Sequence, residues 1–325
     1  MRISKPYLRA FLFCIVLVLC VIFLNFLLVP YSSMMKRFRS FHEEEKNGNI
    51  DVLVIGSSLE FNSVDPAVMS EKSRLHCAVF APQGTNTETA YNCLVDALGA
   101  NKISTVIIGW TMLDRFEYPY KPYPSNRRAQ MYREMLSHSK HNFPLMALAL
   151  KNIMKQRYTM TMFEYAAFPE NAAQIKKAIQ SRKYKKLPFE PESFFEKAMD
   201  MNDIYNPKYE LVDVLACSYA KKPNPAENEY IEKIRDLCKE KEINLYFISC
   251  PYPQIVQTEV KDYGLMLDES KKLFDSLSVK FIDMQDVLPE IAANENYHDC
   301  GGHLIIAAKV AYTKALVRYL KSCGN

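Results

Sequence analysis

Three residue types that together carry out nucleophilic acyl transfer stand at separated places in this sequence. Ser58 follows the apolar run Val52–Ile55, and Asp299 and His303 lie in the segment YHDCGGHL near the C-terminus. A serine hydroxyl is a weak nucleophile until a base removes its proton, which a histidine oriented by a carboxylate does near neutral pH. The sequence therefore predicts Ser58 as nucleophile, His303 as general base and then acid, and Asp299 as its orienting residue.

Glycine and polar residues also stand where other strands are expected to end. Only 9 of the 325 residues are glycine, and glycine permits positive φ and close approach of backbone to ligand. We expect Gly56 to permit a sharp turn before Ser58, and the N–H groups of Ser58 and Gly84 to stabilise an oxyanion. The candidate oxyanion and substrate-binding residues are Gly84, Asn86, Gly109 and Thr111. The competing interpretation is that the serine caps a helix and the glycines serve ordinary turns.

The elements that would position these residues alternate between strand-like and helical patterns. Strand-like runs lie at 52–55, 78–81, 105–108, 245–249 and 279–282. Helical periodicity covers 87–98, 225–241, 263–277 and 304–320. This alternation predicts an α/β domain with an open, doubly wound parallel sheet. In such sheets ligands bind outside the carboxyl ends of the strands, where the candidate residues stand.

These segments resemble the conserved blocks of the SGNH/GDSL hydrolase superfamily. VLVIGSSLEFNSVDP resembles the first block, with Ser58 rather than Ser57 as nucleophile, and APQGTN resembles the second through Gly84. HDCGGHL resembles the last block through His303. The resemblance covers about 50–109 and 243–320 and implies a flavodoxin-like SGNH hydrolase fold. Within the superfamily, the layout is similar to membrane-anchored bacterial envelope proteins of the DltD type and the alginate-acetylation type.

The resemblance implies extracytoplasmic, serine-dependent acyl transfer or ester hydrolysis on a cell-envelope polymer, of the O-acyl, O-acetyl or D-alanyl type. It implies no metal or organic cofactor and no nucleic-acid partner. The expected partners are a cell-surface polymer or acyl donor and a membrane-bound O-acyltransferase. The alternative is a catalytically inactive SGNH-like binding or scaffold partner of that acyltransferase. A flavodoxin-like nucleotide binder is a third interpretation, but Gly56-Ser57-Ser58 matches no phosphate-binding loop.

Two departures from the superfamily pattern favour the inactive alternative. Gly109-Trp110-Thr111 replaces the usual Gly-x-Asn, although Thr111 or Asn86 is a possible substitute donor. The spacing from Asp299 to His303 is one residue longer than D-x-x-H. Glu295 and His298 have the shorter spacing, but Leu304 and the expected last helix directly follow His303, which favours the Asp299 and His303 pair.

The N-terminal region predicts a membrane anchor. Residues 10–29 read AFLFCIVLVLCVIFLNFLLV, with no charged residue, and about 20 such residues cross ~30 Å of hydrocarbon as a helix. The alternative is a cleaved signal peptide, whose apolar region runs only ~7–15 residues. We therefore predict a cytoplasmic tail at 1–9, a transmembrane signal anchor at 10–30, a stalk at 31–49 and an extracytoplasmic SGNH-like domain at 50–325, in the cell membrane.

Residues from about 115 to 224 break the strand and helix alternation and predict a basic, mainly helical insertion. Between 115 and 190 there are 15 Lys and Arg against 5 Glu, whereas the whole chain carries a net charge of only +4. One interpretation is a solvated helical face, and the other is a basic cap that attracts an anionic polymer or lipid headgroups. The nine cysteines show no zinc-ligand spacing, and the odd number outside the anchor predicts free thiols.

Overall fold

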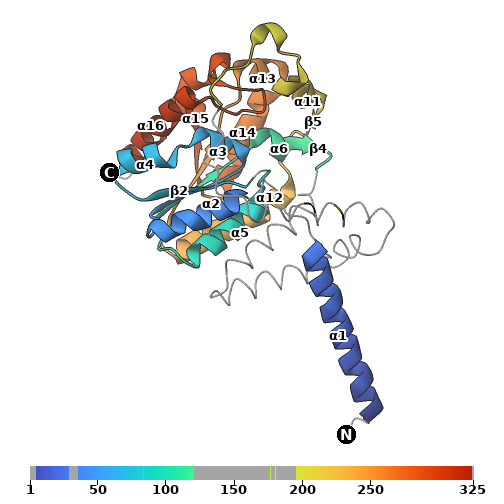
Figure 1. Ribbon diagram of the computed structural model, residues 1–325. Helices are drawn as coiled ribbons and strands as arrows, with labels where there is room; N and C mark the ends of the chain where they lie inside the picture. The colour runs from blue at the N-terminus through green and yellow to red at the C-terminus, as the bar shows by residue number, and fades with distance from the viewer. Residues whose placement is uncertain are drawn as a thin grey trace. The chain divides into compact units, whose positions relative to one another are not determined.

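The computed structural model describes residues 5–28, 36–82, 84–120, 176, 180 and 195–323. The predicted site lies in a compact unit that spans 37–122 and 190–325. Its centre is a five-stranded sheet in the order β2-β1-β3-β6-β7 (Figure 1), and every neighbouring pair is parallel. The strands are β1 (Val52–Ile55), β2 (Cys77–Phe80), β3 (Thr105–Gly109), β6 (Asn244–Ser249) and β7 (Lys280–Asp283).

The strands are short and apolar because helices cover the sheet. All four residues of β1 are buried, and Val54 pairs with Val79 on one side and Ile107 on the other. A parallel strand that is covered on both faces is a continuous apolar run rather than an alternating one. The predicted α/β class with a parallel sheet is confirmed, and the strand order is compatible with a doubly wound fold.

Helices lie on both sides of the sheet. Helix α5 (Thr87–Leu98) packs against α12 (Pro225–Glu240), and α4 (Pro66–Ser73) packs against α16 (Ile306–Cys323). Figure 1 shows the first pair below β2 and the second pair above it. The other helices of this unit are α2 (Lys36–Glu44), α3 (Ser58–Ser63), α6 (Met112–Phe116), α11 (Leu211–Ala216), α13 (Gln254–Glu259), α14 (Tyr263–Ser276) and α15 (Met284–Val287).

Helix α2 corrects the prediction of a polar stalk at 31–49. Phe38 and Phe41 are fully buried, with ring centroids 4.9 and 4.1 Å from the ring of Phe80 in β2. These two phenylalanines are three residues apart, so they share one face of the helix. The charged residues around them hid this short apolar stripe in the sequence. The α/β unit therefore begins at about residue 37 rather than at residue 50.

The N-terminal segment forms helix α1 (Lys5–Leu28), which overlaps the predicted anchor. Within the part of the chain that the structure describes, no helix is long and apolar enough to cross a membrane. The transmembrane assignment of 10–30 is therefore not confirmed.

The predicted insertion is only partly described. Residues 121–175, 177–179 and 181–194, which hold most of its basic charge, lie outside the described residues. Close to its two ends, β4 (Glu117–Tyr118) pairs antiparallel with β5 (Ser218–Tyr219). This two-stranded ribbon brings the ends of the segment back to the same place, as an insertion into an α/β domain requires.

Candidate active site

The Gly-Ser-Ser turn after β1 starts helix α3 with a capping box. The Ser57 hydroxyl accepts a hydrogen bond from the Leu59 N–H (3.2 Å), and the Glu60 carboxyl group accepts one from the Ser57 N–H (2.6 Å). This reciprocal arrangement satisfies two N–H groups that the start of a helix leaves unpaired. Ser57 is therefore the helix cap, and Ser58 is the first residue of the helix.

Two glycines make room for the Glu60 side chain, which is completely buried at the carboxyl end of the sheet. A Cβ atom at Gly56 or at Gly109 would overlap the Glu60 carboxyl group. Gly56 does not have a positive φ, so the turn between β1 and α3 is made without a left-handed glycine. Both glycines are needed for the space that they leave, not for their conformational freedom.

Thr111 belongs to this buried network rather than to an exposed oxyanion hole. Its hydroxyl lies 3.0 Å from the hydroxyl of Ser57, and both residues are 2 % exposed. Since Ser57 donates its only hydroxyl proton to Glu60 (3.1 Å), Thr111 donates to Ser57. The Thr111 hydroxyl, one of the predicted oxyanion donors, is thus engaged in the buried network.

Ser58, by contrast, makes few interactions. It is partly exposed, and its hydroxyl and its N–H have no hydrogen-bond partner among the described residues. Its carbonyl accepts a 2.6 Å hydrogen bond from the Asn62 side chain, which fixes the first turn of α3. An unpaired hydroxyl and an unpaired N–H on one residue are what a nucleophile and its oxyanion donor require.

The segment after β2 supplies a second unpaired N–H. Gly84 has a φ of +69°, a left-handed conformation that favours glycine, and its N–H has no partner among the described residues. Asn86 caps helix α5, because its side-chain oxygen accepts a hydrogen bond from the Thr89 N–H at 2.9 Å. Gly84 and Ser58 thus keep the N–H groups that the sequence analysis assigned to the oxyanion, whereas the Asn86 oxygen is occupied.

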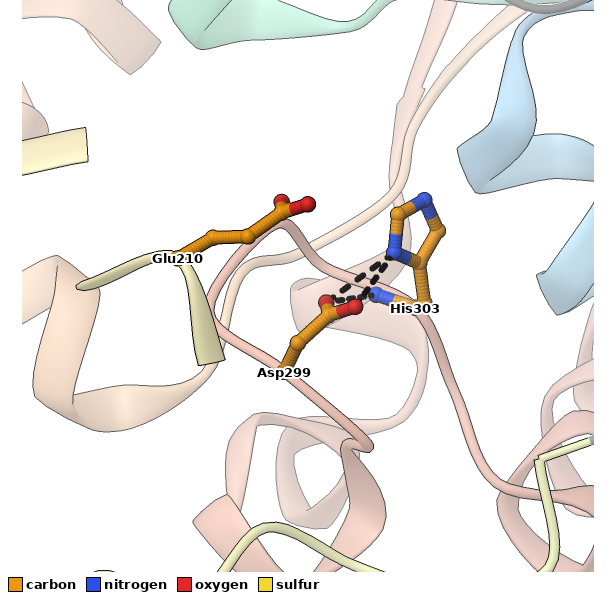
Figure 2. Close-up of side chains that lie close together, drawn as sticks. All are labelled: Glu210, Asp299 and His303. Carbon is orange, nitrogen blue, oxygen red and sulfur yellow. Dashed lines mark hydrogen bonds and ion pairs between the residues drawn. The ribbon is translucent and has the colours of Figure 1, made fainter. Parts of the chain in front are cut away.

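His303 and Asp299 form a hydrogen-bonded pair (Figure 2). The His303 Nδ1 atom lies 2.8 and 3.0 Å from the two carboxylate oxygens of Asp299, which is 5 % exposed. The extra residue in the Asp-to-His spacing is absorbed at Gly302, whose φ of +92° only glycine adopts readily. His298, with the shorter spacing from Glu295, instead lies 3.0 Å from the Lys197 carbonyl and is stacked on Phe195.

The other ring nitrogen of His303 is left open. Its Nε2 atom is buried and has no hydrogen-bond partner among the described residues. A buried nitrogen without a partner is costly unless a substrate or a reacting group supplies the missing bond. With Nδ1 bonded to Asp299, Nε2 is the atom that accepts a proton, which is the arrangement of a general base.

Burial and neighbouring charges act in opposite directions on the pKa of His303. Burial lowers it, but the hydrogen bond to Asp299 and the charges of Asp299 and Glu210 outweigh burial and raise the pKa above its usual 6.5. The Arg37 guanidinium opposes this rise. The surroundings therefore stabilise the imidazolium that forms when His303 takes a proton.

The histidine loop and helix α3 are in contact. A Cβ atom at Gly302 would lie 3.4 Å from the Leu59 side chain and 3.4 Å from Tyr252. Leu59 directly follows Ser58, so the loop that carries His303 lies beside the start of α3. The structure shows no hydrogen bond between Ser58 and His303 Nε2. Catalytic hydrogen bonds in unliganded sites are often long and tighten when substrate binds.

Glu210, from the segment assigned to the insertion, joins the Asp299 and His303 pair (Figure 2). One potential ligand atom from each of the three residues lies within 4.8 Å of the other two. A cation fits such a group by distance, but Nδ1 of His303 is already hydrogen-bonded to Asp299. We therefore interpret the cluster as an acid and base group rather than as a metal centre.

A cavity of about 660 Å³ lies elsewhere, at the edge strand β7. No predicted site residue lines it, and its Lys271 is paired with Asp283 (3.2 Å) and Asp286 (3.0 Å). Lys271 is thus paired with two of the carboxylates that line this cavity, and the open nitrogen of His303 locates the candidate site better.

The described cysteines are free, as the odd count predicted. Cys250 is fully buried, and its sulfur lies 3.2 Å from the Tyr312 hydroxyl and 3.6 Å from Glu60. Burial raises the pKa of the Cys250 thiol well above its usual value. The thiol is therefore a core side chain and not a nucleophile.

Comparison with known proteins does not identify the chain. No model of a known protein family matches it, and no curated protein is similar to it. The likeness to SGNH hydrolases therefore consists of the short motifs and the strand-end positions that they occupy.

Two carboxyl groups of the site were not predicted. Glu60 had a readable signal, because Ser57-x-x-Glu60 is a capping-box pattern. Glu210 had no such signal in the sequence. It lies in the segment assigned to the insertion, about 90 residues before His303. Only the folded chain shows that it reaches the histidine.

Proposed function

We propose that this protein is a serine-dependent acyltransferase or esterase of the SGNH type. The observation that supports this most strongly is the Asp299 and His303 pair, whose buried Nε2 atom has no partner among the described residues. The proposal does not depend on overall fold, because the same α/β architecture serves many unrelated functions.

In the proposed reaction, the Ser58 hydroxyl oxygen attacks the acyl carbonyl carbon while its proton moves to His303 Nε2. The N–H groups of Ser58 and Gly84 stabilise the oxyanion, and Asp299 holds the imidazolium. The proton then passes from His303 to the leaving alcohol oxygen as the ester bond breaks. An acceptor hydroxyl or water then attacks the acyl-serine carbonyl carbon and gives its proton to His303 Nε2, which passes it to the Ser58 oxygen as the bond between the acyl group and Ser58 breaks.

The test is turnover of an aryl acetate ester by the full chain, kept in detergent because α1 exposes apolar side chains such as Phe11 and Phe13. Ser58→Ala should reduce kcat by about 10³-fold or more, down to background. Ser63→Ala, the same change at the other end of α3, is the matched control and should keep most of the turnover. Loss of turnover in Ser57→Ala but not in Ser58→Ala would place the nucleophile one residue earlier.

The second candidate function is a non-catalytic binding or scaffold module. It is favoured by the absence of a hydrogen bond between Ser58 and His303 and by the involvement of Thr111 in the buried network. A folded wild-type chain that turns over no ester would support this candidate. The envelope polymer, the acyltransferase partner and the extracytoplasmic location stay predictions from the sequence.

A further inference from the structure

Glu210 brings a second carboxylate to the proposed acid and base pair. Figure 2 shows its side chain extended toward Asp299 and His303, and the nearest ligand atoms of the three residues lie within 4.8 Å of one another. A Cβ atom at Gly301 would overlap the Glu210 carboxylate. Gly301 thus makes room for Glu210, as Gly56 and Gly109 make room for Glu60.

The backbone of Glu210 is in an unusual conformation. Its φ of +61° and ψ of +3° are left-handed, a conformation that is unfavourable for a residue with a Cβ and is usually adopted by glycine or asparagine. The Cys300 N–H donates to the Tyr209 carbonyl at 2.8 Å, which ties this turn to the loop that carries Asp299. Among the described residues, Glu242 and three other non-glycine residues share this left-handed conformation, so what distinguishes Glu210 is the place of its carboxylate beside Asp299 and His303.

Glu210 and His303 each act on the charge of the other. The groups that act on Glu210 are Asp299, Asp213, His303 and His298. Those that act on His303 are Asp299, Glu210 and Arg37. Burial, and then the Asp299 charge, raise the pKa of the Glu210 carboxyl, whereas His303 lowers it. Glu210 and His303 therefore stabilise each other's charged forms.

We propose that Glu210 is a positioning residue of the acid and base pair: its negative charge stabilises the imidazolium of His303 during acyl transfer. This inference rests on the proposed function. Glu210 neither gives nor takes a proton in the reaction, and the proton moves only between Ser58, His303 and the leaving or attacking oxygen.

The experiment compares Glu210→Gln with Asp213→Asn in the full chain, with the aryl acetate as substrate. Asp213→Asn removes the same charge one turn further along α11, from an exposed side chain. Glu210→Gln should lower the plateau kcat by about fivefold, the size expected for one partly exposed charge. It should also move the midpoint of the pH–rate profile to lower pH, because the pKa of His303 falls. Asp213→Asn should change neither quantity.

A third variant separates this role from a purely structural one. Glu210→Gly relieves the left-handed strain, so its melting temperature should equal or exceed that of wild type while its kcat falls as in Glu210→Gln. Unchanged turnover and an unchanged pH profile in both variants would overturn the inference. Loss of wild-type turnover on adding EDTA would show instead that the cluster holds a cation, and would also overturn it.

The titration of His303, followed by NMR, distinguishes failure of the inference from failure of the proposed function. In Glu210→Gln the His303 resonance should titrate at lower pH than in wild type. An unshifted titration overturns the role of Glu210, whatever the turnover. A shifted titration in a chain that turns over no ester refutes the proposed function, and with it the catalytic meaning of the contact.

Discussion

Among the described histidines, His42 and His303 both contact carboxylates, and they are bonded differently. His42 in α2 has a carboxylate at each ring nitrogen, with Glu45 2.6 Å from Nδ1 and Asp96 3.1 Å from Nε2. His303 has a carboxylate at Nδ1 only, and its Nε2 atom has no partner among the described residues. The first histidine joins helix α2 to α5, and the second lies beside the start of α3.

This difference in the pairing of the ring nitrogens distinguishes a histidine with a structural role from a candidate catalytic histidine. Although burial alone would lower it, the carboxylates Asp96 and Glu45 raise the pKa of His42 to about 9. His42 is thus a cation at neutral pH, and it has no lone pair to offer a substrate. His303 has an open Nε2 atom, and Asp299 raises its pKa against the opposing effect of burial, so Nε2 is the atom that can take up a proton. The number of open nitrogens, more than burial, distinguishes the two roles.

The largest expected effect comes from the same substitution at the acidic partner of each histidine. Asp299→Asn should lower kcat by about 10³–10⁴-fold with the melting temperature nearly unchanged, because the histidine loses its orienting carboxylate. Asp96→Asn should leave kcat unchanged but destabilise the fold by about 2 kcal/mol, because His42 loses a buried partner. Aryl ester turnover and urea unfolding measure the two effects. The reverse pattern would contradict the assignment of the two roles.

A second prediction concerns the glycines around Glu60. Gly109→Ala should destabilise the protein by about 3 kcal/mol, because the new Cβ overlaps the buried Glu60 carboxyl group. Gly264→Ala in α14 is the matched control, since nothing lies within 4 Å of its Cβ position. The control should be neutral or stabilising by about 0.5–1 kcal/mol. Equal urea midpoints for the two variants would show that the buried Glu60 site is not tightly packed.

A third prediction concerns the pH dependence of stability due to His42. Its folded pKa of about 9 lies above the unfolded value of about 6.5. The stabilisation, about 3 kcal/mol from the 1.36 kcal/mol per pKa unit, is fully present below pH ~6.5 and is lost as pH rises through about 9. The free energy of unfolding should thus fall from pH 6 to pH 10 more steeply in wild type than in His42→Gln. Parallel pH profiles would contradict the double ion pair.

Much of the fold was predictable from the sequence because most residues of the strands are buried and apolar. β1 is a continuous apolar run with the predicted bounds, and helices Thr87–Leu98 and Pro225–Glu240 match the predicted spans to within one residue. Helix α2 was missed because its contact with the sheet depends on two phenylalanines among charged residues. A composition-based prediction averages over such a short stripe.

The site was predictable only where local motifs carry it. Ser58 and the pair Asp299 and His303 stand at strand and helix boundaries, where residue type and position both point to chemistry. The hydrogen bond between Thr111 and Ser57 joins residues that are 54 positions apart in the sequence. Glu210 lies close to residues about 90 positions further along the chain. Contacts of that separation depend on the assembled sheet and leave no local pattern.

The most direct test of the account is to locate the reactive serine. The full chain is treated with a fluorophosphonate probe, and the adduct is mapped by tandem mass spectrometry in wild type, His303→Ala and His42→Gln. The account predicts an adduct on Ser58 in wild type and in His42→Gln, and none in His303→Ala. An adduct on another serine, an adduct that persists in His303→Ala, or no adduct on the folded wild-type chain would contradict it.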